Sequence, residues 1–489
     1  VMDFPYGLCD RLSKLIPIEG VKPVSLEKAR ATEPEINVIA ENEEGVDELL
    51  ELAGRLEDLV RNVGMHAGGV LIAPGKLTDF CSLYSAENIV AGNDGKAVSQ
   101  YDKDDVEAIG LVKFDFLGLR TLTIIDWAVQ HVNHLLKNQS ALKDTLQNSA
   151  ALAPAFNIET IPLDDPASYD LLKKCNTTAV FQLESRGMKD LIKRLQPSTF
   201  EDIVALVALF RPGPLESGMV EDFINRKHGR AEADYFHPEL EASLKPTYGV
   251  IVYQEQVMQI SQIIGGYTLG GADMLRRAMG KKDPEEMARQ RGIFVAGATN
   301  RGIEEKLSTR LFDLMEMFAG YGFNKSHSAA YALVAYQTAY LKAHFPAAFM
   351  AATLSSDLDN TEKVSTFYAD TLQQNVRVLL PDVNSSSYRF APVDEQTIAY
   401  GLGAIKGTGE AAINCLVAAR EKGGAFKDLF DFCRRVDKRV LNRRTVEALI
   451  KAGAFDSIND NRAALMASVD AALASADQQA RAANQNSLF

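Results

Sequence analysis

The stretch GLVKFDFLGLR, residues 110–120, decides how the rest of the chain is interpreted. Side chains alternate across a strand, so the three apolar residues of VKFDF (112–116) share one face, and Lys113 and Asp115 share the other. A carboxylate held between two phenylalanines is poorly solvated and is costly unless it meets a cation. A divalent metal ion is one such cation, and a lysine or arginine side chain is the other. The pattern alone favours the salt bridge.

Outward from this stretch, the sequence predicts a small sheet over residues 70–117. VLIA at 70–73 has the pattern of a buried strand, and AGNDG at 91–95 is typical of a turn.

Helices are expected in most of the remaining chain. Residues 1–64 have helical periodicity, and so does most of 121–375. Within that region, the polar stretch 137–154 is expected to be a loose connection. Short strands are expected at 377–401, and the tail from 465 onward, rich in Ala, Gln and Asp, is expected to fray.

The 489 residues are 46% hydrophobic and 24% charged, and this length suggests about three domains. The composition excludes collagen-like, low-complexity and wholly disordered proteins. No run of about 18 apolar residues is present, so no membrane-spanning helix is expected. The five cysteines form no CxxC pair, which excludes a common zinc ribbon and favours the reduced thiols of a cytosol. The chain opens with Val1 in mid-pattern, so we expect a piece of a longer protein.

The net charge of −13 argues against a simple nucleic-acid coat protein. Yet the basic residues are clustered, and an acidic body with basic stripes fits an enzyme that grips a polyanion on one face. For any one cluster, an ordinary solvated helix surface is an alternative of equal weight. The three clusters are Arg186, Lys189, Lys193 and Arg194; Arg276, Arg277, Lys281 and Lys282; and Lys438, Arg439, Arg443 and Arg444.

Metal-dependent phosphoryl transfer needs two or three carboxylates in one cluster. No second strand carries an Asp-x-Asp pair, and the acidic residues at 102–105 are expected in a polar surface turn. If Asp115 binds a metal ion, its partner ligands are therefore expected outside this chain. The Gly-Lys pairs near 69–76 and 92–96 have the wrong spacing for a P-loop.

The stretch FAGYGFNKSHSAAY, residues 318–331, is dense in hydrogen-bond donors. Ser326 or Ser328 is expected to cap the helix that follows. Lys325 and His327 would then stand beside a helix N-terminus, where free N–H groups and the helix dipole favour an anion. A triphosphate is a natural occupant of such a position.

Arg276 and Arg277 open the segment RRAMGKK, and on a helix their side chains point about 100° apart. One guanidinium could therefore clamp a phosphate while the other holds structure.

The segment GLGAIKGTGE at 401–410 has the glycine spacing of a helix-hairpin-helix element, whose backbone N–H groups can bind a DNA phosphate. Residues 449–456 resemble a degenerate second copy. A plain turn is the alternative. The final residues QNSLF, 485–489, are a candidate peptide anchor for an apolar pocket of a partner, and a frayed end is the alternative.

Seven segments in one order go beyond generic patterns. Together they resemble the alpha subunits of bacterial DNA polymerase III, the C-family replicative polymerases, over the whole chain. The segments are HAGGVLIAP (66–74), GLVKFDFLGLR (110–120), FQLESRGM (181–188), FRPGP (210–214), YQEQ (253–256), RRAMGKK (276–282) and GFNKSHSAAY (322–331).

The resemblance implies a mainly helical α+β fold, with part of a palm of the polymerase-beta-like nucleotidyltransferase type. The expected divisions are a helical thumb at 1–70, the C-terminal part of the palm at 71–120, fingers at 121–395, the end of the fingers with the helix-hairpin-helix element at 396–460, and a flexible tail at 461–489.

The resemblance also implies roles for single residues. Asp115 matches the third of three palm aspartates that hold two Mg²⁺ ions, the first two lying upstream of Val1, and Lys113 matches a catalytic lysine facing the nucleotide phosphates. The residues implied to meet the incoming dNTP are Arg276, Arg277, Tyr321, Lys325, Ser326 and His327. Those implied to bind DNA are Lys406, Gly407, Gly409, Arg443 and Arg444. Those implied to bind a sliding clamp are Gln485, Leu488 and Phe489.

The implied activity is that of a DNA-directed DNA polymerase, which adds dNMP to a primer 3′-hydroxyl and releases pyrophosphate. Because two aspartates are missing, the chain alone is expected to be inactive. The implied partners are primer–template DNA, dNTPs, the sliding clamp and, in the full-length family protein, the proofreading exonuclease and clamp-loader tau subunits. The implied location is the bacterial cytoplasm, at the nucleoid. A non-catalytic DNA-binding or interaction module is the alternative.

Overall fold

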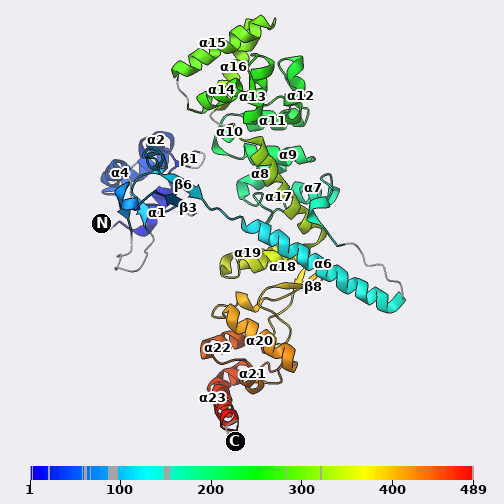
Figure 1. Ribbon diagram of the computed structural model, residues 1–489. Coiled ribbons are helices and arrows are strands. Elements are labelled where there is room, and N and C mark those ends of the chain that lie inside the picture. Colours follow the sequence, from blue (N-terminus) through cyan, green and yellow to red (C-terminus); the bar gives the residue numbers. More distant parts are fainter. Residues whose placement is uncertain are drawn as a thin grey trace. The chain divides into compact units, whose positions relative to one another are not determined.

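A computed structural model describes residues 2, 4–19, 22–57, 59, 63–66, 68–85, 97–147, 155–281, 284–319 and 322–486 (Figure 1). The chain divides into two compact units, Val1–Leu119 and Arg120–Phe489, here called the first unit and the second unit. Most described residues are helical and the strands are short, so the predicted mainly helical α+β class is confirmed.

The N-terminal half of the first unit is helical, as its periodicity predicts. Its core consists of Leu12, Ala29, Ile36, Ile39, Val46 and Leu50. The helices are α1 (Tyr6–Leu15), α2 (Leu26–Thr32), α3 (Pro34–Asn42) and α4 (Val46–Arg55), and a short antiparallel pair, β1 (Ile18–Glu19) and β2 (Lys22–Pro23), joins the first two.

The second half of the first unit contains the predicted strands, but as two separate ribbons. Strand β3 (Gly69–Ile72) pairs antiparallel with β6 (Val112–Asp115), and β4 (Leu83–Tyr84) pairs with β5 (Val98–Ser99). Helix α5 (Lys103–Ala108) lies where only a polar turn was predicted. The Asp102 carboxylate starts this helix, because it accepts the N–H groups of Asp104 and Asp105 at 2.9 Å.

The second unit begins with a long series of helices. Their cores are formed mainly by apolar faces that pack around α9 and α17 and, separately, between α6 and α18. The helices are α6 (Arg120–Gln147), α7 (Pro166–Lys173), α8 (Arg186–Leu195), α9 (Phe200–Leu209), α10 (Pro212–Glu216), α11 (Met219–Lys227), α12 (Glu241–Leu244), α13 (Gln254–Ile263), α14 (Leu269–Lys281), α15 (Pro284–Asn300), α16 (Glu305–Ala319), α17 (Lys325–His344), α18 (Pro346–Ser356) and α19 (Thr361–Gln373).

The end of the second unit contains the short strands predicted for 377–401. Strand β9 (Thr397–Ala399) lies between β7 (Arg377–Val378), to which it is parallel, and β8 (Ala391–Asp394), to which it is antiparallel. Four helices follow, and they share one apolar core. They are α20 (Glu410–Gly423), α21 (Leu429–Arg435), α22 (Arg443–Lys451) and α23 (Arg462–Asn486).

Two expectations of loose structure were wrong. Helix α6 continues through Gln147, across the first part of the stretch predicted to be a loose connection. The tail predicted to be flexible from 461 forms α23, whose buried residues are Leu465, Val469, Ala472 and Ala476. These residues are spaced by four, three and four positions, so they form one apolar stripe, which packs against α21 and α22. Alanine-rich composition indicated disorder, but alanine is also the strongest helix former.

Candidate functional site

Asp115 and Lys113 lie on one face of β6, as the alternation predicts. Lys113 Nζ is 3.4 Å from Asp115 Oδ1, and His66 Nε2 is 3.9 Å from the same oxygen. The His66 Nδ1 atom accepts the Gly68 N–H at 3.1 Å, and the other ring nitrogen, Nε2, lies on the side of the carboxylate. Sequence reasoning missed His66, although it opens the HAGG segment.

Gly69 makes room for this imidazole. A Cβ atom at position 69 would lie 2.8 Å from His66 Nδ1 and 3.3 Å from Asp115 Oδ1. The side chain of any other residue would therefore push His66 away from the carboxylate.

The prediction that Asp115 is poorly solvated was wrong. Its side chain is 41% exposed, and Phe114 and Phe116 are exposed at 48% and 71%. The apolar face of the β3–β6 ribbon is open, and its cross-strand pairs Val70–Phe114 and Ile72–Val112 also lie on this exposed face. Asp115 therefore keeps an accessible carboxylate beside the Lys113 ammonium.

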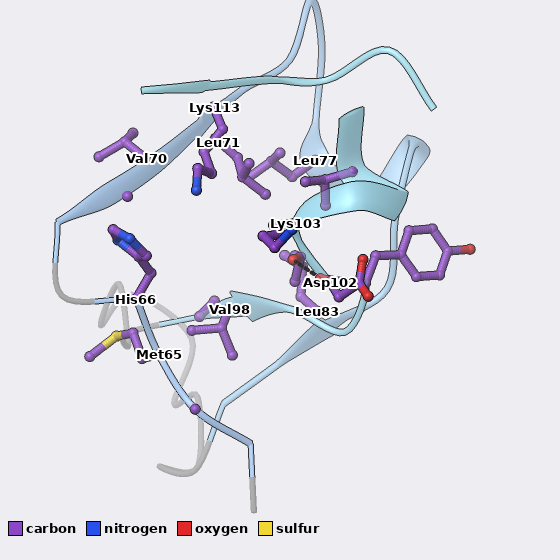
Figure 2. A pocket seen from close by; sticks show the side chains of 16 residues that line it. Met65, His66, Val70, Leu71, Leu77, Leu83, Val98, Asp102, Lys103 and Lys113 are labelled. Atoms are coloured by element: carbon purple, nitrogen blue, oxygen red, sulfur yellow. Dashed lines mark hydrogen bonds between the residues drawn. The ribbon is translucent and has the colours of Figure 1, made fainter. Parts of the chain in front are cut away.

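His66 and Lys113 also line a pocket of about 470 Å³ in the first unit (Figure 2). Asp102 and Lys103 at the start of α5 lie on its wall, together with apolar side chains such as Leu71 and Leu77. The pocket thus combines two lysines, a histidine and an aspartate with apolar side chains.

The donor set fits Mg²⁺ only in part. Mg²⁺ prefers oxygen ligands and is commonly held by one or two carboxylates, waters and substrate phosphates. Asp115 supplies one accessible carboxylate. Across the described ranges, no group of three or more His, Cys, Asp or Glu side chains could hold a metal ion. Any Mg²⁺ at Asp115 therefore needs further ligands from substrate or from groups other than these residues.

In the second unit, the start of α13 is joined to the segment before α17. The Gln254 N–H donates to Phe323 O at 2.9 Å, and the Gln254 side chain donates to Gly322 O at 3.0 Å. A Cβ atom at Gly322 would lie 3.1 Å from Gln254 Cγ, so the glycine permits this close approach. The YQEQ and GFNKSHS segments, which are distant in the sequence, are thus joined by backbone and side-chain hydrogen bonds.

The cap of α17 was predicted incorrectly. Asn324, and neither Ser326 nor Ser328, accepts the His327 N–H, at 2.7 Å. Ser328 is fully buried, and its hydroxyl has no hydrogen-bond partner among the described residues.

Glu255 occupies the position where an anion was predicted at this helix start. Its carboxylate accepts the Lys325 N–H at 2.9 and 3.0 Å and the Asn324 side-chain amide at 3.0 Å. Since two of the first N–H groups already have acceptors, a bound anion would be held mainly by the exposed side chains of Lys325, Ser326 and His327.

Aromatic rings hold the His327 imidazole. Its centroid is 4.2 Å from the Tyr331 ring and 5.3 Å from the Phe323 ring. On the Phe323 ring lies the Arg211 guanidinium, at 4.1 Å. Lys325 Nζ is 5.5 Å from the Tyr253 ring. A cationic and aromatic surface therefore covers the start of α17.

The two arginines of α14 share one carboxylate. Arg276 binds Asp273 Oδ1 at 2.8 Å, and Arg277 binds Asp273 Oδ2 at 2.9 Å. The hydrogen bond from Arg276, together with these charges, lowers the pKa of Asp273. Arg276 also donates to Gln254 Oε1 at 3.3 Å, which links it to the start of α17. Sequence reasoning missed Asp273 and Gln254; the i,i+3 spacing to Arg276 was the available signal for Asp273.

One of the helix-hairpin-helix glycines, Gly407, packs against α22. Gly407 has φ +99°, and a Cβ atom there would lie 3.7 Å from the Arg444 side chain. Thr445 Oγ1 donates to Gly407 O at 3.4 Å. Arg443 already pairs with Glu447 at 2.7 Å and Asp470 at 3.0 Å. The structure thus brings Gly407 and Arg444 together, while Lys406 and Gly409 are exposed beside them.

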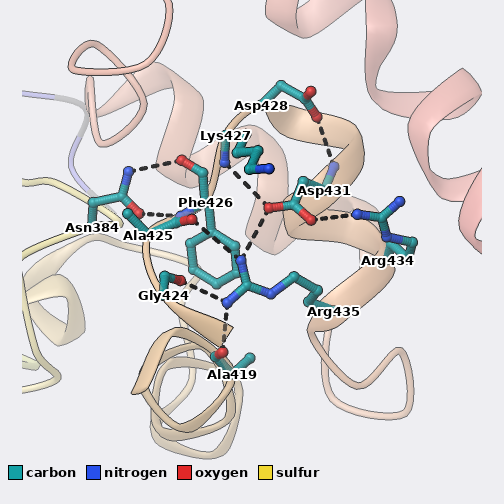
Figure 3. A network of polar contacts seen from close by, with 10 residues as sticks. All are labelled: Asn384, Ala419, Gly424, Ala425, Phe426, Lys427, Asp428, Asp431, Arg434 and Arg435. Carbon is teal, nitrogen blue, oxygen red and sulfur yellow. Dashed lines mark hydrogen bonds and ion pairs between the residues drawn. The ribbon is translucent and has the colours of Figure 1, made fainter. Parts of the chain in front are cut away.

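A polar network joins two helices that follow these glycines in the chain (Figure 3). Arg435 donates to the carbonyls of Ala419 and Gly424 at 2.7 Å and to Asp431 at 3.0 Å, and its guanidinium lies 4.5 Å from the Phe426 ring. The network ties the end of α20 to α21.

Comparisons with known proteins identify the family. Three family models match: the bacterial DNA polymerase III alpha NTPase domain at 1–118, its finger domain at 121–302, and a helix-hairpin-helix motif at 375–465. DNA polymerase III subunit alpha of Escherichia coli (strain K12) is 56% identical over 99% of this chain, and those of Pasteurella multocida and Neisseria meningitidis serogroup B are each 55% identical, over 98% and 100%. The chain belongs to the family of bacterial DNA polymerase III alpha subunits. It spans about 40% of the length of these relatives.

This alpha-subunit family accounts for the order of motifs and for the glycine-rich hairpins. The helix-hairpin-helix prediction is confirmed, because the matching model covers both copies. Tyr321, Lys282, Leu488 and Phe489 lie outside the described residues, and Gln485 lies in the last turn of α23. None of the described helices is long and apolar enough to cross a membrane.

Proposed function

We propose that this chain is part of the catalytic alpha subunit of bacterial replicative DNA polymerase III, which adds dNMP to a primer 3′-hydroxyl and releases pyrophosphate. The observation that carries the proposal is the single surface formed by Arg276, Lys325 and His327. Gln254 joins α14 to the segment before α17, and this link brings Arg276 close to the segment that carries Lys325 and His327. A triphosphate is the ligand that such a surface fits.

Asp115 would hold Mg²⁺ in the whole enzyme, with the two other palm carboxylates and the substrate phosphates as further ligands. Bound Mg²⁺ supplies two effects there: it lowers the pKa of the primer hydroxyl and neutralises the leaving pyrophosphate. The exposed apolar face at Phe114 and Phe116 fits a position against further palm elements, because a sheet with such a face requires a covering layer.

The residues of this chain bind and orient the nucleotide. Lys113 lies beside Asp115, so its ammonium would meet the same phosphates as the metal-binding carboxylate. Arg276 and Lys325 would stabilise the charge that moves onto the leaving pyrophosphate. His327, held by its two aromatic neighbours, would donate a hydrogen bond without reorganisation. Primer–template DNA would contact the helix-hairpin-helix glycines, and the enzyme would work at the nucleoid.

Replacing Arg276 or His327 with alanine is expected to raise the KM for dNTP about ten-fold or more, because a hydrogen bond to a charged group contributes about 1.5–3 kcal/mol. The Kd for primer–template DNA should change less than two-fold. Steady-state extension and DNA binding by the full-length alpha subunit measure both quantities.

Arg289→Ala is the matched control for Arg276→Ala. It removes an arginine that pairs with Glu286, three residues earlier, as Arg276 pairs with Asp273. This control should leave the KM unchanged. If Arg276→Ala or His327→Ala lowers the affinity for DNA as much as the affinity for dNTP, the assignment to nucleotide binding is contradicted. These side chains would then bind DNA instead.

The peptide QNSLF at 485–489 is proposed to bind the sliding clamp through Leu488 and Phe489. The double change of both residues to alanine should weaken clamp binding about 30-fold, because losing two anchor residues at about 1 kcal/mol each costs about 2 kcal/mol together. Surface plasmon resonance with immobilised clamp measures the Kd. Ser487→Ala is the control within the same peptide, and a double variant that binds as tightly as this control would contradict the assignment.

A further inference from the structure

Helix α8 carries a basic stripe that the nucleotide site does not use. One face of the helix is buried through Met188, Leu191, Ile192 and Leu195. The opposite face displays Arg186, Lys189, Lys193 and Arg194. Arg186, Lys189 and Lys193 are spaced by three and four positions, so they form one row, about 10 Å long.

Most of the charge in this row is not neutralised by the chain itself. Arg194 pairs with Glu221, and Lys189 Nζ donates to Thr178 Oγ1 at 3.0 Å. Within the part of the chain that the structure describes, Arg186 and Lys193 make no ion pair or side-chain hydrogen bond. The exposed acids on or beside the helix are Glu184 and Asp190.

The neighbouring turn extends the basic surface. The Cys175 thiol donates to the carbonyls of Lys173 and Lys189, which places the end of α7 against α8. Lys174 is exposed in this turn. Basic side chains therefore outnumber the acidic ones on this surface.

The first turn of α8 approaches the nucleotide surface. A Cβ atom at Gly187 would lie 2.9 Å from the Phe210 ring, so the helix packs directly on that residue. The next residue, Arg211, covers the Phe323 ring, which contacts His327. Upstream of α8, Phe181 lies 5.4 Å from Tyr331, the other neighbour of His327.

We infer that the α8 stripe binds the backbone phosphates of single-stranded DNA, and that this strand is the template on its way to the nucleotide site. A row of cations beside half-buried aromatic rings is the usual composition of a single-strand surface, where charge binds phosphates and rings stack on bases. Lysine and arginine side chains that contact only phosphates bind DNA independently of its base sequence. The identity of this strand as the template rests on the proposed function, whereas the binding of single-stranded DNA to α8 does not.

The test is DNA binding by the 489-residue chain without dNTP or metal ion, measured by fluorescence anisotropy with labelled oligo-dT at several salt concentrations. The variant Arg186→Glu with Lys193→Glu should bind about ten-fold more weakly. The slope of the logarithm of the binding constant against the logarithm of salt concentration should become less steep by about 1.4. Each phosphate contact on a single strand contributes about 0.7 to this slope, and the variant loses two contacts. The milder Arg186→Gln with Lys193→Gln should change in the same direction.

The matched control is Lys137→Glu with Lys306→Glu, which makes the same change in charge at two exposed positions on α6 and α16. If the control weakens binding as much as the α8 variant, the effect is one of net charge and the inference is overturned. Loss of affinity for a duplex hairpin without loss for oligo-dT would also overturn it. Because nucleotide is absent from the assay, failure of the dNTP assignment would leave this result unaffected.

Discussion

Primer extension by the full-length alpha subunit is expected to fall about 1,000-fold when Asp115 is replaced by asparagine. The substitution keeps the size of the side chain and removes its charge. Stabilisation of the transition state by a metal ion is worth several kcal/mol, and about 4 kcal/mol corresponds to a factor of roughly 10³ in rate. Because Asp115 is 41% exposed, its loss should not unfold β6.

The single-turnover rate at saturating dNTP measures this effect, and the Kd for primer–template DNA should remain within two-fold of the original. Asp104→Asn is the control, since Asp104 is an exposed carboxylate of the same unit that pairs with Lys103. Normal turnover by Asp115→Asn would remove Asp115 from metal binding. The role of this carboxylate would then be its ion pair with Lys113, which is the interpretation that the strand pattern alone favours.

Local patterns predicted the elements that depend on near neighbours. The period-two alternation of VKFDF placed Lys113 and Asp115 on one face of a strand, and the glycine spacing at 401–410 predicted the hairpin. Exposure of the same strand could not be predicted, because it depends on what packs against the opposite face. A phenylalanine indicates a buried face only where a second layer is present.

Long-range contacts decide the rest of the candidate site. The segment 324–328 offers Asn324, Ser326 and Ser328 as caps, and all three residue types are suitable. Asn324 is the residue that caps the helix. Its amide and the Lys325 N–H both donate to Glu255, which lies about 70 residues earlier in the sequence. Likewise, the hydrogen bond from Arg276 to Gln254 crosses 22 residues and has no local signature.

A buried lysine stabilises the other end of the helix that carries Lys325 and His327. Lys342 Nζ, with no exposed side-chain surface, lies 2.8 Å from Asp370 Oδ2 on α19. It also donates to the carbonyls of Asn176 and Thr178 at 2.9 and 2.7 Å. Burial lowers the pKa of Lys342, while the Asp370 carboxylate opposes this shift. The ammonium thus joins α17, α19 and the turn after α7.

Lys342→Met is expected to lower the free energy of unfolding of the second unit by about 3–5 kcal/mol, since removing one partner of a buried ion pair leaves an uncompensated charge. The two carbonyls would lose their donor as well. Urea unfolding followed by the fluorescence of Trp127, the only tryptophan, measures the change, because this residue packs against the α6–α18 core.

Lys363→Met is the control, because it breaks an ion pair at the surface. The Lys363 side chain is 55% exposed and its ammonium lies 3.3 Å from Asp357, so the substitution should lower the free energy of unfolding by less than about 1 kcal/mol. The double variant Lys342→Met with Asp370→Leu should recover part of the loss, because an apolar pair of similar volume often replaces a buried ion pair at little cost. If Lys342→Met unfolds at the same urea concentration as Lys363→Met, the ion pair does not hold α17 in place, and the position of Lys325 and His327 must depend on Glu255 and Asn324 at the start of the helix.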